Sequence, residues 1–181
     1  MPLLRSLIPV GNSTLVGGPI GFPSGGHTIV IKLAEARSLV EVGADKLDMM
    51  INLGRLKSGD LCYVRDEIKA LVEMIAPIPL KIILEVSRLS DYEISRGSEC
   101  AVEGGAAFIK TSTGWTGETT TLKHIRIINA VAQGSCGIKA SGGIRNLDTI
   151  KAMLSLGVSR FGINKRVAVE LMEECAFSEV C

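Results

Sequence analysis

The sequence has few aromatic residues and no dominant charge of either sign, and these absences exclude several classes of function. Aromatic residues make up 4% of the 181 residues, which leaves few side chains on which nucleic-acid bases stack. The 20 lysines and arginines face 19 aspartates and glutamates, so the formal net charge is +1. No basic or acidic tail is present. We therefore expect neither nucleic acid nor a membrane surface as a partner.

The chain also lacks the marks of a secreted, membrane or metal-binding protein. Residues 1–6 do not show the charged and then long apolar order of a signal peptide, and no apolar run approaches a membrane span. The 5 cysteines are odd in number, none has C-x-x-C spacing, and the 2 histidines lie far from them. Neither a zinc site nor a disulfide framework is indicated. We expect a cytoplasmic protein with reduced thiols, no metal ion and no cofactor.

Apolar runs and amphipathic segments alternate along the whole chain. Two architectures accommodate this pattern, an open doubly wound sheet and a (β/α)8 TIM barrel. No G-x-G-x-x-G motif follows the first strand, and polar residues gather at the C-terminal end of almost every strand, as in barrel enzymes. We predict a single α/β domain, residues 1–181, with a TIM-barrel fold of about six units instead of eight. The predicted strands are 13–22, 46–52, 80–86, 106–110, 136–140 and 158–163, and the predicted helices are 28–42, 60–75, 91–103, 120–132, 147–156 and 166–175.

Three charged residues interrupt the apolar strands. Lys110 and Lys139 each close a strand, and Asp48 lies within another. Burial and a neighbouring positive charge both favour the neutral form of an amine, which is a nucleophile toward carbonyl carbons. Each residue alone also fits a structural interpretation: a lysine that extends to water from a strand end, or Asp48 in a buried ion pair with either lysine. The three together predict a Schiff-base centre in which Asp48 moves protons.

Glycines follow the last two predicted strands, where barrel enzymes commonly bind phosphate. Gly142 and Gly143 follow one strand and Gly162 ends the next, and both positions precede a predicted helix. Glycines let backbone N–H groups approach an anion, and a helix N-terminus adds positive potential. Arg145 and Lys165 would add charge. The other interpretation of the glycine pair is a tight turn between a strand and a helix.

Five segments of the chain resemble the motifs of the deoxyribose-phosphate aldolases, a family of class I Schiff-base aldolases with a (β/α)8 barrel. They are, in order, IGFPSG at 20–25, LDMMINLG at 47–54, LKSG at 56–59, FIKTSTG at 108–114 and IKASGGIR at 138–145. The resemblance implies that Lys110 carries the Schiff base, that Lys139 keeps that amine nucleophilic, and that Asp48 relays protons. It implies substrate or phosphate binding by Gly114, Gly142, Gly143, Arg145, Gly162, Asn164 and Lys165.

The implied reaction is the cleavage of 2-deoxy-D-ribose 5-phosphate to acetaldehyde and D-glyceraldehyde 3-phosphate, without a metal ion. Two alternatives stay open at this point. One is a class I aldolase that acts on a different phosphosugar, and the other is a non-catalytic sugar-phosphate-binding protein or an inactive fragment of the barrel.

The chain departs from the family pattern in two places. The first two barrel strands have no counterpart, and residues 2–7 correspond to the end of the second helix. We therefore expect low activity, and self-association or a homo-oligomer formed through the open edge of the barrel. In addition, Asn164 and Lys165 stand where the family usually has a serine pair that holds phosphate. Either the charge of Lys165 replaces the hydroxyl hydrogen bonds, or the tail of the substrate differs.

Overall fold

Six strands form one parallel sheet in which the strands follow the order of the sequence. The computed structural model describes residues 2–178, and each strand in this part of the chain pairs in parallel with the next. The predicted alternating α/β architecture with six units is confirmed. Within the described residues β1 and β6 do not pair with each other, so the sheet is not closed into a barrel. The strands are β1 (Gly17–Ile20), β2 (Lys46–Met50), β3 (Leu80–Ile83), β4 (Phe108–Lys110), β5 (Gly137–Ser141) and β6 (Val158–Gly162).

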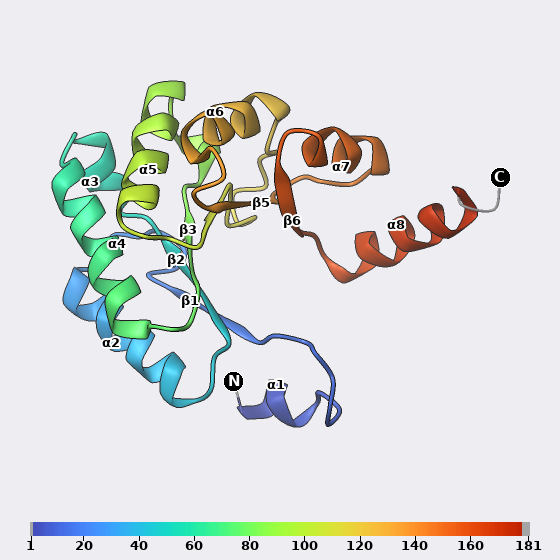
Figure 1. Ribbon diagram of the computed structural model, residues 1–181, viewed down its shortest axis with the longest axis horizontal. Coiled ribbons are helices and arrows are strands. Elements are labelled where there is room, and N and C mark those ends of the chain that lie inside the picture. Colours follow the sequence, from blue (N-terminus) through green and yellow to red (C-terminus); the bar gives the residue numbers. More distant parts are fainter. Residues whose placement is uncertain (1, 179–181) are drawn as a thin grey trace.

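Helices connect successive strands and lie along the sheet. Figure 1 shows α2, α4, α5 and α6 beside the strands, with α7 and α8 beyond β6. No helix in the described chain is long and apolar enough to cross a membrane. The helices are α1 (Pro2–Ser6), α2 (Ile29–Glu41), α3 (Leu53–Lys57), α4 (Leu61–Ile75), α5 (Asp91–Glu103), α6 (Leu122–Ala132), α7 (Leu147–Leu154) and α8 (Lys165–Ser178), with a short 3-10 helix, η1 (Val86–Arg88).

Side-chain caps mark the starts of several predicted helices, among them α4, α5 and α7. The Asp60 carboxylate and the Asn146 amide oxygen accept backbone N–H bonds at the first turns of α4 and α7. At the start of α5, Ser90 and Glu93 form a capping box, in which each side chain bonds to the backbone of the other residue. These bonds satisfy N–H groups that have no partner within the helix.

The structure differs from the sequence prediction at several strand boundaries. The predicted strand 80–86 ends at Ile83, because Glu85 takes a left-handed conformation and the 3-10 helix η1 begins at Val86. The predicted strand 13–22 is shorter, because the backbone N–H and the hydroxyl of Thr14 both donate to Asn12 Oδ1 and no ladder forms before Gly17. The predicted strand 46–52 ends early, because the Asn52 side chain accepts the backbone N–H of Arg55 at 3.1 Å and begins a helix. That helix, α3, was not predicted.

One continuous hydrophobic core fixes the strands against α2, α4, α5 and α6. All four positions of β3 are buried, as expected of a central parallel strand. Helix α8 does not join this core and packs instead through a small separate cluster of Leu147, Val167 and Leu171. The strand ends that carry the polar residues are therefore held in register by a large apolar layer beneath them.

A buried ion pair lies in the layer between the helices and the sheet. Lys32 on α2 and Glu67 on α4 have no exposed side-chain surface, and Lys32 Nζ lies 2.8 Å from Glu67 Oε2. The same ammonium donates to the Met50 carbonyl oxygen of β2 at 3.0 Å. The pair thus joins two helices to one strand.

Candidate active site

The register of the strands brings four charged residues together. Asp48 on β2 is paired with Lys81 on β3, and Lys110 on β4 is paired with Lys139 on β5. Neighbouring strands lie about 4.8 Å apart, so side chains at matched positions reach one another easily. The predicted adjacency of Lys110 and Lys139 is confirmed, and Asp48 lies two strands from Lys110, as expected.

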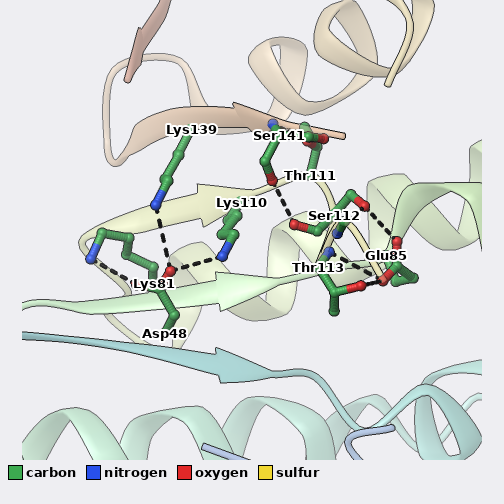
Figure 2. Close-up of polar contacts among 10 residues, drawn as sticks. Asp48, Lys81, Glu85, Lys110, Thr111, Ser112, Thr113, Lys139 and Ser141 are labelled. Carbon is green, nitrogen blue, oxygen red and sulfur yellow. Dashed lines mark hydrogen bonds and ion pairs between the residues drawn. The ribbon is translucent and has the colours of Figure 1, made fainter. Parts of the chain in front are cut away.

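Three ammonium groups surround the single carboxylate of Asp48. Lys110 Nζ donates a hydrogen bond of 2.9 Å to Asp48 Oδ2, and Lys139 Nζ lies 3.6 Å from the same oxygen. Lys81 Nζ lies 2.9 Å from Oδ1, in an ion pair whose atoms are not aligned for a hydrogen bond. Figure 2 shows the three lysines converging on Asp48 from three strands. The four side chains form one charged group, which we call the amine centre.

Most of the amine centre is shielded from water. The Lys81 side chain is 1% exposed, and the side chains of Asp48, Lys110 and Lys139 are between 14% and 18% exposed. Burial lowers the pKa of Lys81. Burial, together with the positive charges of Lys110 and Lys81, also lowers the pKa of Lys139, against the opposing effect of Asp48. The centre therefore contains amines that lose a proton more readily than a free lysine.

The pKa of Asp48 is lowered as well, but for an acid a lower pKa favours the ionised form. Burial alone would raise its pKa, but the ammonium groups of Lys110, Lys81 and Lys139 outweigh that effect and hold the pKa at about 2. The carboxylate is therefore ionised at neutral pH. It can accept a proton from a bound group and return it.

Lys110 lies between two cavities. A cavity of about 280 Å³ is lined by Asp48, Lys110 and Lys139, together with Phe22 and the start of β1. A larger cavity of about 470 Å³ lies on the side of the loops that follow β4, β5 and β6. Lys110 is thus a residue shared by the linings of both cavities.

The larger cavity gathers most of the predicted anion-binding residues. Gly114, Gly142, Gly143, Arg145, Gly162 and Asn164 line it, along with Thr113, Glu118 and Ser141. Lys165 does not line this cavity, and its side chain is exposed at the start of α8.

Several of the residues that line the larger cavity already form hydrogen bonds or ion pairs within the protein. The Gly114 N–H donates to Ser112 Oγ, and Asn164 Oδ1 accepts the backbone N–H of Val167 as the cap of α8. Glu118, a carboxylate at the same cavity, lies 3.8 Å from a guanidinium nitrogen of Arg88. Of the groups predicted to supply charge, only Arg145 lies at the cavity wall.

The glycine pair after β5 has a conformation that other residues rarely adopt. Gly142 and Gly143 have φ values of +93° and +71°. A Cβ atom on Gly143 would also overlap the side chain of Thr119, and one on Gly142 would lie 3.1 Å from Ser112 Oγ. The turn therefore requires glycine at both positions, and it exposes backbone toward the cavity.

Hydroxyl groups tie the loop after β4 to the loop after β5. The Thr111 hydroxyl donates to the Ser141 carbonyl oxygen at 2.9 Å and accepts the Ser141 N–H at 2.9 Å. The Ser141 hydroxyl donates to the Ser112 carbonyl oxygen at 2.5 Å, and Thr120 adds a further bond to Thr111. The two loops that carry Lys110 and the glycine pair are thus joined as one unit.

Sequence reasoning missed two residues of the site, Lys81 and Glu85. Lys81 interrupts the apolar run 80–84, which is the signal that identified Asp48. Glu85 directly follows the same strand, where the other polar site residues also lie, and its carboxylate bonds to Ser112 and Thr113. The three predicted residues were found because each interrupts or closes an apolar strand. The same criterion applies to Lys81 and Glu85.

The donor set of the site suits amine chemistry better than metal binding. Within residues 2–178 no group of three His, Cys, Asp or Glu side chains is placed to hold a metal ion. Lysine ammonium groups repel cations, and Asp48 is the one carboxylate that they share. The arrangement can form a covalent bond to a carbonyl carbon and move protons beside it.

Known proteins resemble this chain in both sequence and fold. A sequence model of the DeoC/LacD family of aldolases matches residues 17–162. The deoxyribose-phosphate aldolase of Sinorhizobium medicae is 61% identical over 176 residues, which are 97% of this chain and 71% of that protein. A deoxyribose-phosphate aldolase of Klebsiella pneumoniae is 42% identical over 173 residues, which are 94% of this chain and 70% of that protein.

Solved structures agree with these sequence matches. A structure described as an aldolase has a TM-score of 0.88 at 35% identity, and the alignment covers 99% of this chain and 79% of the other. A tetrameric deoxyribose phosphate aldolase from Aeropyrum pernix has a TM-score of 0.78 at 27% identity, with 93% and 70% of the two chains covered.

Proposed function

The chain belongs to the DeoC/LacD family of aldolases, and we propose that it cleaves 2-deoxy-D-ribose 5-phosphate to acetaldehyde and D-glyceraldehyde 3-phosphate. The observation that carries the proposal is the amine centre: three lysines around one ionised aspartate, with Lys110 at the wall of a 470 Å³ cavity. This set is more than sugar binding requires, which favours catalysis over the alternative of a binding protein.

Lys110 is the proposed nucleophile. Its neutral amine attacks C1 of the open-chain sugar, and the carbinolamine loses water to leave an iminium ion. Removal of the C3 hydroxyl proton then breaks the C2–C3 bond, and its electron pair moves toward the iminium to form an enamine. Glyceraldehyde 3-phosphate leaves, the enamine is protonated at C2, and hydrolysis frees acetaldehyde and Lys110. The iminium is the electron sink, so no metal ion is needed.

Asp48 and Lys139 are proposed to move and balance the protons of these steps. Asp48 Oδ2 lies within 2.9 Å of Lys110 Nζ, so a proton can pass between them directly or through a water molecule. Lys139, whose pKa is lowered, adds positive charge beside Lys110 and can itself exchange a proton. General acid–base groups of this kind contribute roughly 10²- to 10⁴-fold to a rate.

The larger cavity is the proposed site of the phosphate group. Gly142, Gly143 and Gly162 bring backbone to its wall and Arg145 supplies a positive charge. Gly114 and Asn164 contribute to its shape, whereas we place Lys165 outside the direct contacts. Because Asn164 occupies this wall, a second candidate substrate is a different phosphosugar cleaved by the same amine chemistry.

The functional form of the protein is proposed to be an oligomer in the cytoplasm. The free sides of β1 and β6 in the described chain are edges of the kind through which sheets associate. Light scattering on purified protein would show a dimer or larger species, and a monomer at every concentration tested would contradict this part of the proposal.

The cleavage assay tests the proposed function. Purified protein is mixed with 2-deoxy-D-ribose 5-phosphate, and acetaldehyde and glyceraldehyde 3-phosphate are measured with coupled enzymes. We expect both products in equal amounts, with no loss of rate in EDTA. The dephosphorylated sugar should show a higher KM, because it lacks the group that the larger cavity binds. Activity that EDTA abolishes and a divalent metal restores would rule out the Schiff-base mechanism.

A further inference from the structure

Glu85 has a backbone conformation that is unusual for its residue type. It follows β3 with φ of 56° and ψ of 61°, in the left-handed region, and it is only 3% exposed. A glutamate in this region is strained relative to glycine. Strain of this kind persists where the surrounding contacts fix the residue, and it is common near functional sites.

The hydrogen bonds of the Glu85 carboxylate lead to the segment that carries Lys110. Its Oε1 accepts the Ser112 hydroxyl at 2.7 Å. Its Oε2 accepts the Thr113 N–H at 3.1 Å and also the Thr113 hydroxyl in a short bond. Figure 2 shows the carboxylate of Glu85 facing these two residues. All the donors are neutral, so each of these bonds serves to place the Ser112–Thr113 turn.

The neighbours of Glu85 bond to the preceding part of the same segment. The Leu84 N–H donates to the Lys110 carbonyl oxygen at 3.0 Å, and the Val86 N–H donates to the Thr111 carbonyl oxygen at 2.9 Å. Residues 84–86 therefore hold four successive residues, 110–113, through main-chain and side-chain bonds. The main-chain bonds between the two segments reach Lys110 and Thr111. With its backbone in the left-handed conformation, Glu85 adds side-chain bonds to the next two residues, Ser112 and Thr113.

We propose that Glu85 is a positioning residue for the Schiff-base lysine. By holding the Ser112–Thr113 turn, it fixes the direction in which Lys110 leaves β4 and places Thr113 and Gly114 at the wall of the larger cavity. The inference rests on the proposed function, because it assigns Glu85 a role in imine formation at Lys110. It adds a residue, one that contacts neither the amine nor either cavity, to the machinery of that reaction.

The proposal predicts slower imine formation when the carboxylate is removed. In Glu85→Gln, an NH2 group replaces one oxygen, so Ser112 and Thr113 can no longer both donate to the side chain. In Glu85→Gly, the backbone strain is relieved while the carboxylate is lost. We expect both variants to form the imine about 10- to 100-fold more slowly, since small misplacements of a reacting group have effects of this size. Because Glu85→Gly relieves strain, it should keep a higher Tm than Glu85→Gln.

The experiment measures the rate at which acetaldehyde and borohydride label Lys110, followed by mass spectrometry, alongside kcat, KM and Tm. Glu93→Gln is the matched control, because Glu93 also accepts a hydroxyl and a backbone N–H, from Ser90, but does so at the start of α5 away from the site. It should lower Tm and leave labelling within about 2-fold of wild type.

A double-mutant cycle with Ser112→Ala adds a second test, measured with whichever of the two Glu85 variants folds. Ser112 donates to Glu85 and does not line either cavity, so the double variant should label little more slowly than the slower single variant. Wild-type labelling rates in folded Glu85 variants, or strictly additive effects, would overturn the positioning role and leave the proposed function intact. Wild-type protein that is never labelled would overturn both.

Discussion

Two buried groups of lysines and carboxylates in this molecule differ in their balance of charge. Between the helices and the sheet, Lys32 and Glu67 form a closed pair, one cation for one anion, with no exposed surface. In the amine centre, three cations share the single carboxylate of Asp48 and border two cavities. Both groups consist of lysines and carboxylates, and their shortest nitrogen–oxygen distances are similar, 2.8 Å and 2.9 Å. They differ in the ratio of cations to anions and in whether a cavity borders them.

The balance of charge decides which physical effect controls each pKa. For Lys32 and Glu67 burial is the largest effect: it lowers the pKa of the lysine and raises that of the glutamate, and the partner only partly compensates. For Asp48, three ammonium groups overcome burial and the pKa falls to about 2. A matched pair in the core thus joins structural elements, whereas an excess of lysines beside a cavity keeps a carboxylate ionised and leaves amines ready to lose protons.

Breaking the closed pair should have the largest effect on stability. Lys32→Met leaves Glu67 buried without a partner, which we expect to lower the free energy of unfolding by about 3–5 kcal/mol. The double variant Lys32→Met with Glu67→Leu should recover most of that loss, since well-packed apolar residues often replace a buried pair without cost. Chemical denaturation measures both. Loss of activity in the folded double variant would show that the pair is not purely structural.

Removing the shared carboxylate should affect catalysis more than folding. We expect Asp48→Asn to lower kcat by roughly 100- to 1,000-fold, because proton transfer beside Lys110 loses its relay. The volume and most of the packing are unchanged. Steady-state kinetics and borohydride labelling separate the steps: Lys110 should still be labelled while turnover is slow. Turnover within about 3-fold of wild type would remove Asp48 from the mechanism.

The charge of Asp48 also predicts a dependence of stability on pH. Its folded pKa of about 2 lies below the ordinary value of 3.8, so the ionised form stabilises the fold. This contribution, about 2 kcal/mol, is fully present above pH ~4 and is lost as the pH falls toward ~2. Denaturation of wild type and Asp48→Asn should therefore differ less at pH ~2 than at pH ~5. A difference that does not change with pH would contradict the low pKa.

The smallest effect is expected at Lys165, whose charge is exposed and lies outside the larger cavity. Lys165→Ala should change KM for the phosphorylated sugar by less than about 2-fold, as is typical of exposed charges. Arg145→Ala, which removes a charge at the cavity wall, should raise that KM by roughly 10-fold or more. A large rise in KM with Lys165→Ala, specific to the phosphorylated sugar, would restore Lys165 to the phosphate site.

The sequence was sufficient to predict the parts of the fold that depend on local patterns. Alternating apolar runs and helical stripes predicted all six strands of the described chain and the longer helices between them. Helix α3 was missed because its short length gives no apolar period, and its cap, Asn52, was read as the end of a strand. Strand ends shifted where a side chain, as at Asn12, competed for the backbone.

The candidate site was only partly predictable for a different reason. Asp48, Lys110 and Lys139 stand out because each interrupts or closes an apolar run, and the parallel register then brings them together. The role of Glu85 depends on a left-handed turn and on contacts with residues 27 and 28 positions later in the chain. The exposure of Lys165 depends on where α8 lies, which no local pattern specifies.

The most direct test of the amine centre is to find which lysine is labelled by acetaldehyde and borohydride. Peptide mapping of the wild-type protein would distinguish Lys81, Lys110 and Lys139, and Lys110→Met provides the control. We predict a reduced two-carbon adduct on Lys110, absent from the variant, with Lys32 unlabelled in its closed pair. An adduct on Lys139 or Lys81 in place of Lys110, or none in an active protein, would contradict the account.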